Sequence, residues 1–373
     1  MLKRFLVPML IGYVIGIISG VFEFEFVVRL LFTISSNFLQ LILFVAPFLV
    51  LVFAISGTND LRGNLKSFIF RFFGIIFSSL LLVGGLTLVT SNLILPSILM
   101  EMEQSKPIFL DPYFVLDIQP MFSVISGMLA GILFGSFLEK DSKTMDIVRE
   151  LEKWIAKFST SFLLPLMPIW IMGTFAKAGF VNQGVEILYN DFVMSWLIIG
   201  LQFLWLGFMY FIASKYSGVS FKMIVREATK IYIKVVSIMG MGTGIIIPFV
   251  VKAQEDIGVD SGTAKIVSAS SLNMPGSVIS NIVFSYGIII MFNIDISLST
   301  YLIYVVMLVL ATMIAPAVTG GVFAVNSGLL TPILGFTPDQ ISIMGSFYYT
   351  QGTSNSATNN SADLYLGPIL SKK

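Results

Sequence analysis

Residues 350–363 read TQGTSNSATNNSAD, and eleven of these fourteen residues are polar. The stretch nevertheless lies inside an apolar block of about 338–368, which is long enough to cross a lipid bilayer. An aspartate at the centre of a membrane helix costs about 2.5–3.5 kcal/mol, so such a residue is a functional candidate. Asn359 and Asp363 are spaced i, i+4 and share one helical face. Their oxygens are hard ligands, so the stretch favours a cation site within the membrane.

Two other interpretations of this polar stretch stay open from the residues alone. Ser, Thr and Asn also join membrane helices to one another, which would make the stretch a packing seam. Only ten residues follow Asp363, so the acid could also lie at the membrane surface. The density of amides and the interrupted apolar blocks nearby favour the binding site.

The composition predicts an α-helical membrane protein with several spans. The 373 residues are 56% hydrophobic and 12% charged, with a mean hydropathy of +0.92, against about 45–50% and 25% in soluble domains. Backbone groups in lipid must pair internally, which makes the long apolar runs helical, and alternating strand patterns are absent. The chain has no Cys and no His, and its net charge is +1. We therefore expect no enzyme, no thiolate metal site, no organic cofactor and no nucleic-acid partner.

The apolar blocks suggest eight spans and two re-entrant hairpins. Two of the apolar blocks, about 220–256 and 299–335, are interrupted by Gly240–Gly244 and by Ala315–Gly321. Their arms of about 14 residues are too short to span, and paired interrupted elements are typical of a transporter binding site. The eight continuous blocks lie at about 5–22, 26–56, 66–98, 113–138, 154–178, 190–214, 264–292 and 338–368.

Basic residues orient this topology. With a cytoplasmic N-terminus, the inner segments carry 19 of the 22 basic residues, as the positive-inside rule requires. We expect both termini in the cytoplasm of a bacterial inner membrane, with the first hairpin entering from inside and the second from outside. The first block follows Lys3 and Arg4 and lacks a cleavage site, so we interpret it as a retained helix. Treating the hairpins as full spans preserves part of the pattern.

A second polar stretch, Ser268–Ser277, contains Asn273-Met274-Pro275-Gly276 inside an apolar span. Proline removes one backbone donor and unwinds the helix locally. The freed carbonyls can coordinate a cation, as in discontinuous transporter helices. An ordinary proline kink explains the same residues equally well.

The order of these elements resembles the dicarboxylate/amino acid:cation symporters, the family that includes the glutamate transporters. The resemblance covers nearly the whole chain, through short motifs in the expected order. Asn273–Ser277 resembles the family's Asn-Met-Asp-Gly-Thr, and Thr358–Asp363 resembles the Asn-x-x-Gly-Asp end of its eighth helix. The other matching segments are Val115–Pro120, Pro168-Ile169 with Gly179 to Gly184, and Pro248–Ala253 with Gly258.

The resemblance implies a homotrimer with an elevator mechanism. Residues 1–65 and 99–189 would form a scaffold of helices 1, 2, 4 and 5. Residues 66–98 and 190–373 would form the moving transport domain, with helices 3, 6, 7 and 8 and both hairpins. Ser78-Ser79 is a weak counterpart of a Thr-Ser pair on helix 3. The family's sodium ligands correspond here to Asn273, Asn359 and Asp363.

The resemblance also implies a substrate site between the hairpin tips and helix 8. We expect this site to involve Gly242, Thr243, Gly244, Ser277, Thr319, Gly320, Gly352, Asn355 and Ser356. Pro275 replaces the family's Asp, which puts one of its sodium sites in question. The family's substrate-binding Asp and Arg fall near Gly352 and Asn355, so an acidic substrate side chain would lack its counter-ion.

These observations predict a sodium-coupled symporter for a small solute of the amino acid/dicarboxylate class, with a neutral solute included. Sodium would be the coupling ion, and the partners would be the bilayer, the solute and two further copies of the chain. A channel or uncoupled permease is the first alternative, and a ligand sensor that does not transport is the second.

Overall fold

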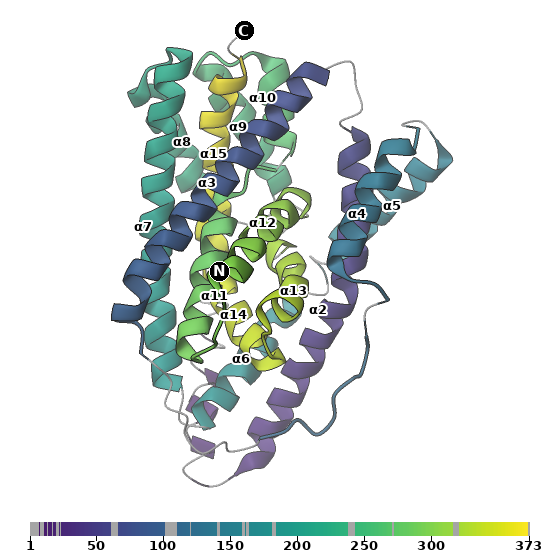
Figure 1. Cartoon of the computed structure of the whole chain (residues 1–373), viewed down its shortest axis with the longest axis vertical. Helices are drawn as coiled ribbons and strands as arrows, with labels where there is room; N and C mark the ends of the chain where they lie inside the picture. Colours follow the sequence, from purple (N-terminus) through teal and green to yellow (C-terminus); the bar gives the residue numbers. More distant parts are fainter. Residues whose placement is uncertain are drawn as a thin grey trace.

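The computed structural model describes the chain apart from residues 1–6, 8–10, 13, 17, 20–21, 23, 61–65, 101–109, 120, 140–141, 159–160, 162–163, 181–183, 238–242, 271, 316–320 and 372–373. The described residues form helices and loops without a strand (Figure 1). Their order is α2 (Glu25–Asp60), α3 (Lys66–Ile98), α4 (Val124–Phe137), α5 (Lys143–Phe158), α6 (Leu164–Phe180), α7 (Gly184–Ser217), α8 (Phe221–Ser237), α9 (Thr243–Asp256), α10 (Ser261–Ser270), α11 (Pro275–Met291), α12 (Leu298–Ile314), α13 (Gly321–Leu334), α14 (Pro338–Thr350) and α15 (Gly352–Ser371).

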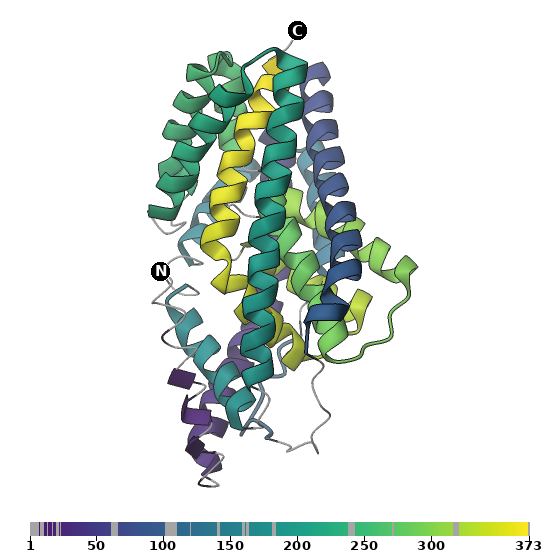
Figure 2. The same cartoon turned by 90° about the vertical axis from the view of Figure 1, so that its left-hand side faces the viewer.

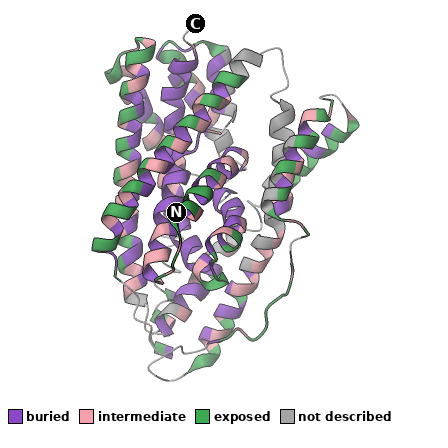
Figure 3. Ribbon diagram, viewed as in Figure 1, coloured by how far each residue is buried: buried purple, intermediate pink, exposed green. Residues whose placement is uncertain are grey.

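The helices pack in two groups. α2 lies against α4, α5 and α6, whereas α3 packs on α11 and α12. In Figure 2 the yellow α15 runs between the teal α7 and the green pair α8 and α9, and it contacts all three helices. The groups meet where α12, α13 and α14 contact α2. The group around α15 holds nearly all of the polar candidates, and their buried surroundings are visible in Figure 3.

Two described helices have the length and composition of membrane spans, Phe70–Ile98 and Glu186–Ser217. α7 exposes large apolar side chains along one side, including Trp196 at 61% and Leu204 at 72% exposure. Apolar side chains on the outside of a long helix are what lipid accepts and water does not.

The two interrupted blocks form pairs of neighbouring short helices, α8 with α9 and α12 with α13. The first member of each pair has 17 residues and the second has 14. At a rise of 1.5 Å per residue these helices are roughly 21–26 Å long, short of the roughly 30 Å hydrocarbon core. These lengths agree with those expected for the hairpin arms. That the two pairs are re-entrant in a membrane stays a prediction.

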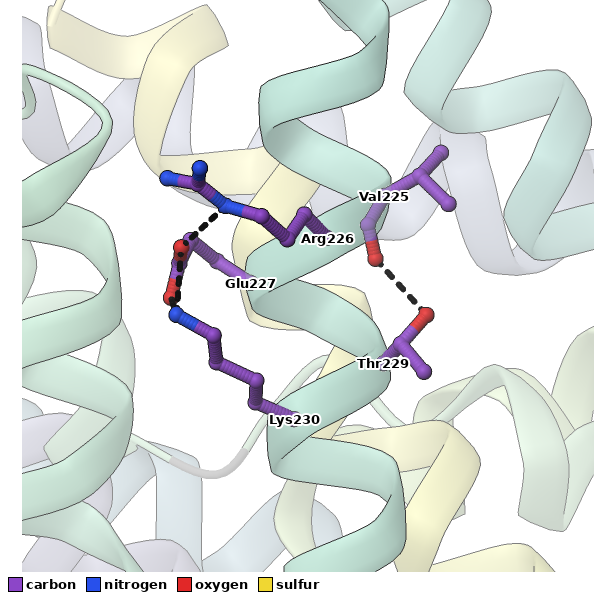
Figure 4. Close-up of polar contacts among 5 residues, drawn as sticks. All are labelled: Val225, Arg226, Glu227, Thr229 and Lys230. Atoms are coloured by element: carbon purple, nitrogen blue, oxygen red, sulfur yellow. Dashed lines mark hydrogen bonds and ion pairs between the residues drawn. The ribbon is translucent and has the colours of Figure 1, made fainter.

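α8 neutralises its own buried charge (Figure 4). Glu227 is only 3% exposed, and its carboxylate accepts hydrogen bonds from Arg226 Nε at 2.9 Å and from Lys230 Nζ at 2.8 Å. Thr229 Oγ1 donates to the Val225 carbonyl on the same helix at 2.8 Å. Because Glu227 is paired, this helix can pack against α15 without an unpaired charge.

Three predicted helix boundaries are wrong. The block 113–138 is helical only from Val124 to Phe137, because side chains of α2 pair with the backbone before it. Thr33 Oγ1 accepts from Tyr113 N at 2.8 Å, and Asn37 Oδ1 accepts from Leu116 N at 2.6 Å. The block 154–178 is divided between α5 and α6. The block 338–368 is divided at Gln351, between α14 and α15.

Candidate functional site: a broken helix held by α15

The seventh apolar block is broken where the sequence places proline. α10 ends at Ser270 and α11 begins at Pro275, with the non-helical residues 272–274 between them. Pro275 occupies the first turn of α11, where its missing N–H costs no helical hydrogen bond. The last carbonyls of α10 lose their helical donors at the same place. The predicted local unwinding is therefore confirmed, and buried Asn273 lies within it.

α15 holds the break from two sides. Asn359 Oδ1 accepts from Gly276 N at 2.9 Å, and Asn359 Nδ2 donates to Ser277 Oγ at 3.0 Å. Six residues later, Tyr365 donates its hydroxyl hydrogen to Asn273 Oδ1 at 2.9 Å. These three hydrogen bonds tie Asn273, within the non-helical segment, and the first turn of α11 to the same helix.

The contact between the two helices requires glycine at position 276. A Cβ at that position would lie 2.9 Å from Thr358 Cβ and 3.0 Å from both Asn355 O and Asn359 Oδ1. Such distances are well inside ordinary van der Waals contact, so a larger residue would separate α11 from α15.

Gln202 of α7 joins the same site from a third side. Its Nε2 donates to Asn355 Oδ1 at 2.8 Å, while its Oε1 accepts from Ser354 Oγ at 2.5 Å and from Thr358 Oγ1 at 3.1 Å. Ser280 Oγ also donates to Asn355 Oδ1, at 2.5 Å. With its oxygen held by two donors, Asn355 keeps a buried Nδ2 that has no partner among the described residues.

A pair of buried amides extends the network towards α13. Asn326 Nδ2 donates to Asn281 Oδ1 at 2.6 Å, and Asn281 Nδ2 donates to the Ser277 carbonyl at 2.8 Å. Both amide side chains are fully buried. The second arm of the α12–α13 pair is thereby linked to the residue that follows the helix break.

Asp363 is the acid of this region, and it is 5% exposed. It lies close enough to Tyr210 and Tyr365 to interact with both rings' hydroxyl groups electrostatically. Tyr210 donates its hydroxyl hydrogen to the Ser361 carbonyl, and Tyr365 donates to Asn273. Within the described part of the chain, no side-chain or backbone donor is hydrogen-bonded to the Asp363 carboxylate. A buried carboxylate without a partner is costly unless a cation or a proton neutralises it.

The chemistry of these residues suits a monovalent cation. The described residues hold no cluster of three or more acidic, His or Cys side chains. One carboxylate next to amide, hydroxyl and carbonyl oxygens supplies hard ligands with a single negative charge. Buried Asn273 and half-buried Asn359 already use their Oδ1 atoms as acceptors, so each has one further lone pair for an ion.

The structure brings together some predicted site residues and leaves others undescribed. Ser277, Asn355 and Asn359 lie in one hydrogen-bond network, and Asn273 is joined to α15 by Tyr365. Gly352 is buried at the start of α15, and Ser356 is half-buried. Predicted residues Gly242, Thr319 and Gly320 lie outside the described residues. Thr243 and Gly244 begin α9, with nothing described of their surroundings.

Sequence reasoning missed several contributors to the site, among them Gln202, Ser280, Tyr210 and Tyr365. Gln202 had a usable signal, since it is an amide within the apolar run of α7. The tyrosines and Ser280 had none, because their sequence surroundings look like ordinary packing. On α3, Ser79 is buried and contacts the Tyr365 hydroxyl at 3.2 Å, whereas Ser78 is exposed.

Discontinuous helices that meet around buried amides and one acid are typical of secondary transporters. The model of the sodium:dicarboxylate symporter family matches residues 5–373. The chain therefore belongs to this family, whose members are integral membrane transporters. A search of curated proteins found no match to the chain.

Proposed function

We propose that this protein is a sodium-coupled symporter for a small organic solute of the amino acid/dicarboxylate class, and that this solute has no acidic side chain and is neutral overall. The observation that carries the proposal is the buried Asp363 carboxylate, which has no hydrogen-bond partner among the described residues and lies on the helix that fixes the break before α11. Sodium binds at Asp363 with oxygens of Asn273 and Asn359 and is itself transported. Sodium and solute raise each other's affinity, because thermodynamic linkage makes the coupling reciprocal.

The polar groups around Asn355 support a neutral solute. Asn355 hydrogen-bonds Gln202 and Ser280, and the Tyr348 hydroxyl faces Asn355 as well as Ser277. Among the described residues, no Lys or Arg makes a hydrogen bond to any of them. Asn355 Nδ2, which has no hydrogen-bond partner among the described residues, offers a donor to a carbonyl, hydroxyl or carboxylate oxygen of the solute, without a full positive charge.

A ligand screen by thermal unfolding tests this function. Purified full-length protein is heated with amino acids, dicarboxylates and neutral metabolites, in sodium buffer and in choline buffer of equal ionic strength. A ligand at 100 times its dissociation constant stabilises the folded state by about 2.7 kcal/mol. We expect a neutral solute to raise the unfolding temperature in sodium and much less in choline. Equal shifts in the two buffers would contradict sodium coupling.

Flux measurements separate the two alternative functions. Liposomes that contain the protein should accumulate the solute found in the screen only under an inward sodium gradient. Current that flows without any coupling between the gradients would indicate a channel or permease. Tight binding without flux would indicate a sensor.

The proposal includes the assembly and topology that the family resemblance implies. The chain forms a homotrimer with eight spans and two re-entrant hairpins, and both termini lie in the cytoplasm of a bacterial inner membrane. Residues 1–65 and 99–189 form the scaffold, and residues 66–98 and 190–373 move. Light scattering in detergent should give a protein mass of three chains, and a monomer mass would contradict this assembly.

A further inference from the structure

A second buried acid without a basic partner among the described residues, Asp191, lies on α7 and takes no part in the site around Asp363. It is 6% exposed and begins the apolar part of that helix. Ser195 Oγ lies 3.4 Å from Asp191 Oδ1, and Thr350 Oγ1 lies 3.5 Å from the same atom. Thr350 is the last residue of α14, so Asp191 faces the interruption between α14 and α15.

Ser195 and Thr350 donate too few hydrogen bonds to satisfy Asp191 as an ionised carboxylate. Thr350 has one hydroxyl hydrogen, and it goes to the Phe347 carbonyl at 2.6 Å rather than to Asp191 at 3.5 Å. The Thr350 oxygen therefore faces Asp191 Oδ1 as one acceptor faces another. Among the described residues, only Ser195 can donate to this carboxyl oxygen, through a long bond. A hydrogen on Asp191 would complete the contact with Thr350.

Within the described part of the chain, no opposite charge compensates Asp191. Among the described residues of α3, α6, α8, α11, α14 and α15, no charged side chain interacts with it, and its polar neighbours are Ser195 and Thr350. The other titratable groups nearby, Glu186 and Tyr189, lie on its own helix, towards the N-terminal end. Unpaired buried carboxylates are strongly unfavourable when charged. Calcium and magnesium ions collect about six or more oxygens, whereas this site offers one carboxyl group and two hydroxyls.

We propose that Asp191, with Ser195 and Thr350, is a proton-binding site separate from the cation site at Asp363. Asp191 Oδ1 takes the proton from a hydronium ion, which leaves as water, and the new O–H donates to Thr350 Oγ1. When the proton is lost, Asp191 Oδ1 and Thr350 Oγ1 are again two acceptors that face each other. The contact between α7 and the α14–α15 junction is then weaker. The proposal does not depend on sodium coupling.

Infrared spectroscopy of the purified full-length protein at neutral pH tests this site. A protonated carboxyl group gives a C=O band separate from the carboxylate bands, and labelling aspartate with ¹³C assigns it. We expect such a band in the wild type, and we expect Asp191→Asn to remove it. The band should remain in the matched control Glu186→Gln and in Asp363→Asn. In Thr350→Val it should remain but shift, because the acceptor is lost.

Three results would contradict the proton-binding site at Asp191. Absence of a labelled C=O band in the wild type would show that Asp191 is ionised, even if Asp191→Asn does not fold. A band that Asp191→Asn leaves unchanged, with intact folding by size-exclusion chromatography, would contradict the assignment. Loss of the band on addition of sodium, in the Asp363→Asn background, would indicate a metal cation in place of the proton.

Discussion

Gln202 holds three segments of the site together with one side chain. It is 1% exposed and bonds Asn355, Ser354 and Thr358 of α15, with a longer contact of 3.4 Å to the Gly276 carbonyl. An amide suits this place because it donates and accepts at once. Gln202 therefore fixes the orientation of the Asn355 side chain, and with it the direction in which Asn355 Nδ2 points.

Replacing Gln202 by methionine should be destabilising, although the volume is nearly conserved. The hydroxyls of Ser354 and Thr358 lose their acceptor, and each unsatisfied buried group costs about 1–3 kcal/mol. We expect the free energy of unfolding in detergent to fall by roughly 2–4 kcal/mol, and solute affinity to fall with it. Leu201→Met, a change at the neighbouring half-buried position, is the matched control. Equal stability of the two variants would show that the Gln202 bonds contribute nothing.

Single residues differ in how far the sequence reveals them. Asp363 and Asn359 are identifiable because polar residues in a lipid-spanning block are costly and rarely incidental. Gln202 and Tyr365 bond partners 153 and 92 positions away in the chain. Their roles depend on which helices become neighbours, and no local pattern encodes that.

The contact of α11 with α15 is the structural centre of the proposed transporter. It brings the start of one broken helix against the middle of another, with Gly276 at the closest approach. The short distance lets Asn359 bond both Gly276 and Ser277. Both the helix break and the nearest ligand oxygens depend on this packing.

Gly276→Ala should therefore weaken both the fold and ion binding. The added methyl group must displace Thr358 or the Asn355 backbone, and overpacking of this kind costs about 1–3 kcal/mol. Gly200→Ala on α7 is the control, because its Cβ would meet nothing within 4 Å, and alanine there favours the helix. Thermal unfolding with and without sodium measures both effects. A Gly276→Ala variant as stable and sodium-responsive as Gly200→Ala would contradict the packing argument.

The helix breaks themselves show what local patterns can predict. Pro275 predicts the break in the seventh block, since proline lacks the backbone donor that a continuous helix needs. The interruption at Gln351 has no such mark, because Gln351 keeps a right-handed helical conformation. The extended segment before α4 was also missed, since its backbone pairs with Thr33 and Asn37 on a distant helix.

The two helix groups are joined at one edge by an ion pair. Lys177 of α6 lies 2.8 Å from Asp339 at the start of α14, and its ammonium group also sits 3.9 Å from the centre of the Phe32 ring. A cavity of about 190 Å³ adjoins this contact, lined also by Asp111. In the elevator mechanism that we propose, α6 is fixed and α14 moves, so this contact must open during transport.

Cysteine cross-linking can test that motion cleanly, because the chain has no native Cys. Lys177→Cys with Asp339→Cys, joined by a short bifunctional thiol reagent, should stop solute uptake by liposomes. The control is Asn92→Cys with Tyr286→Cys, a pair that hydrogen-bonds at 2.6 Å within the moving group. Cross-linking the control pair should leave uptake intact. Continued uptake with the first pair fully cross-linked would exclude relative motion at this edge.

The sodium response of Asp363→Asn tests the central claim most directly. Asparagine keeps the size of the side chain and removes the charge that we assign to the ion. For the wild type, raising sodium from zero to 100 times its dissociation constant should stabilise the fold by about 2.7 kcal/mol. In sodium-free buffer the variant should unfold at a temperature no lower than the wild type, because it lacks the buried charge, and it should lose this increment. A sodium-dependent increase as large in Asp363→Asn as in the wild type would contradict the assignment of Asp363 as the cation ligand.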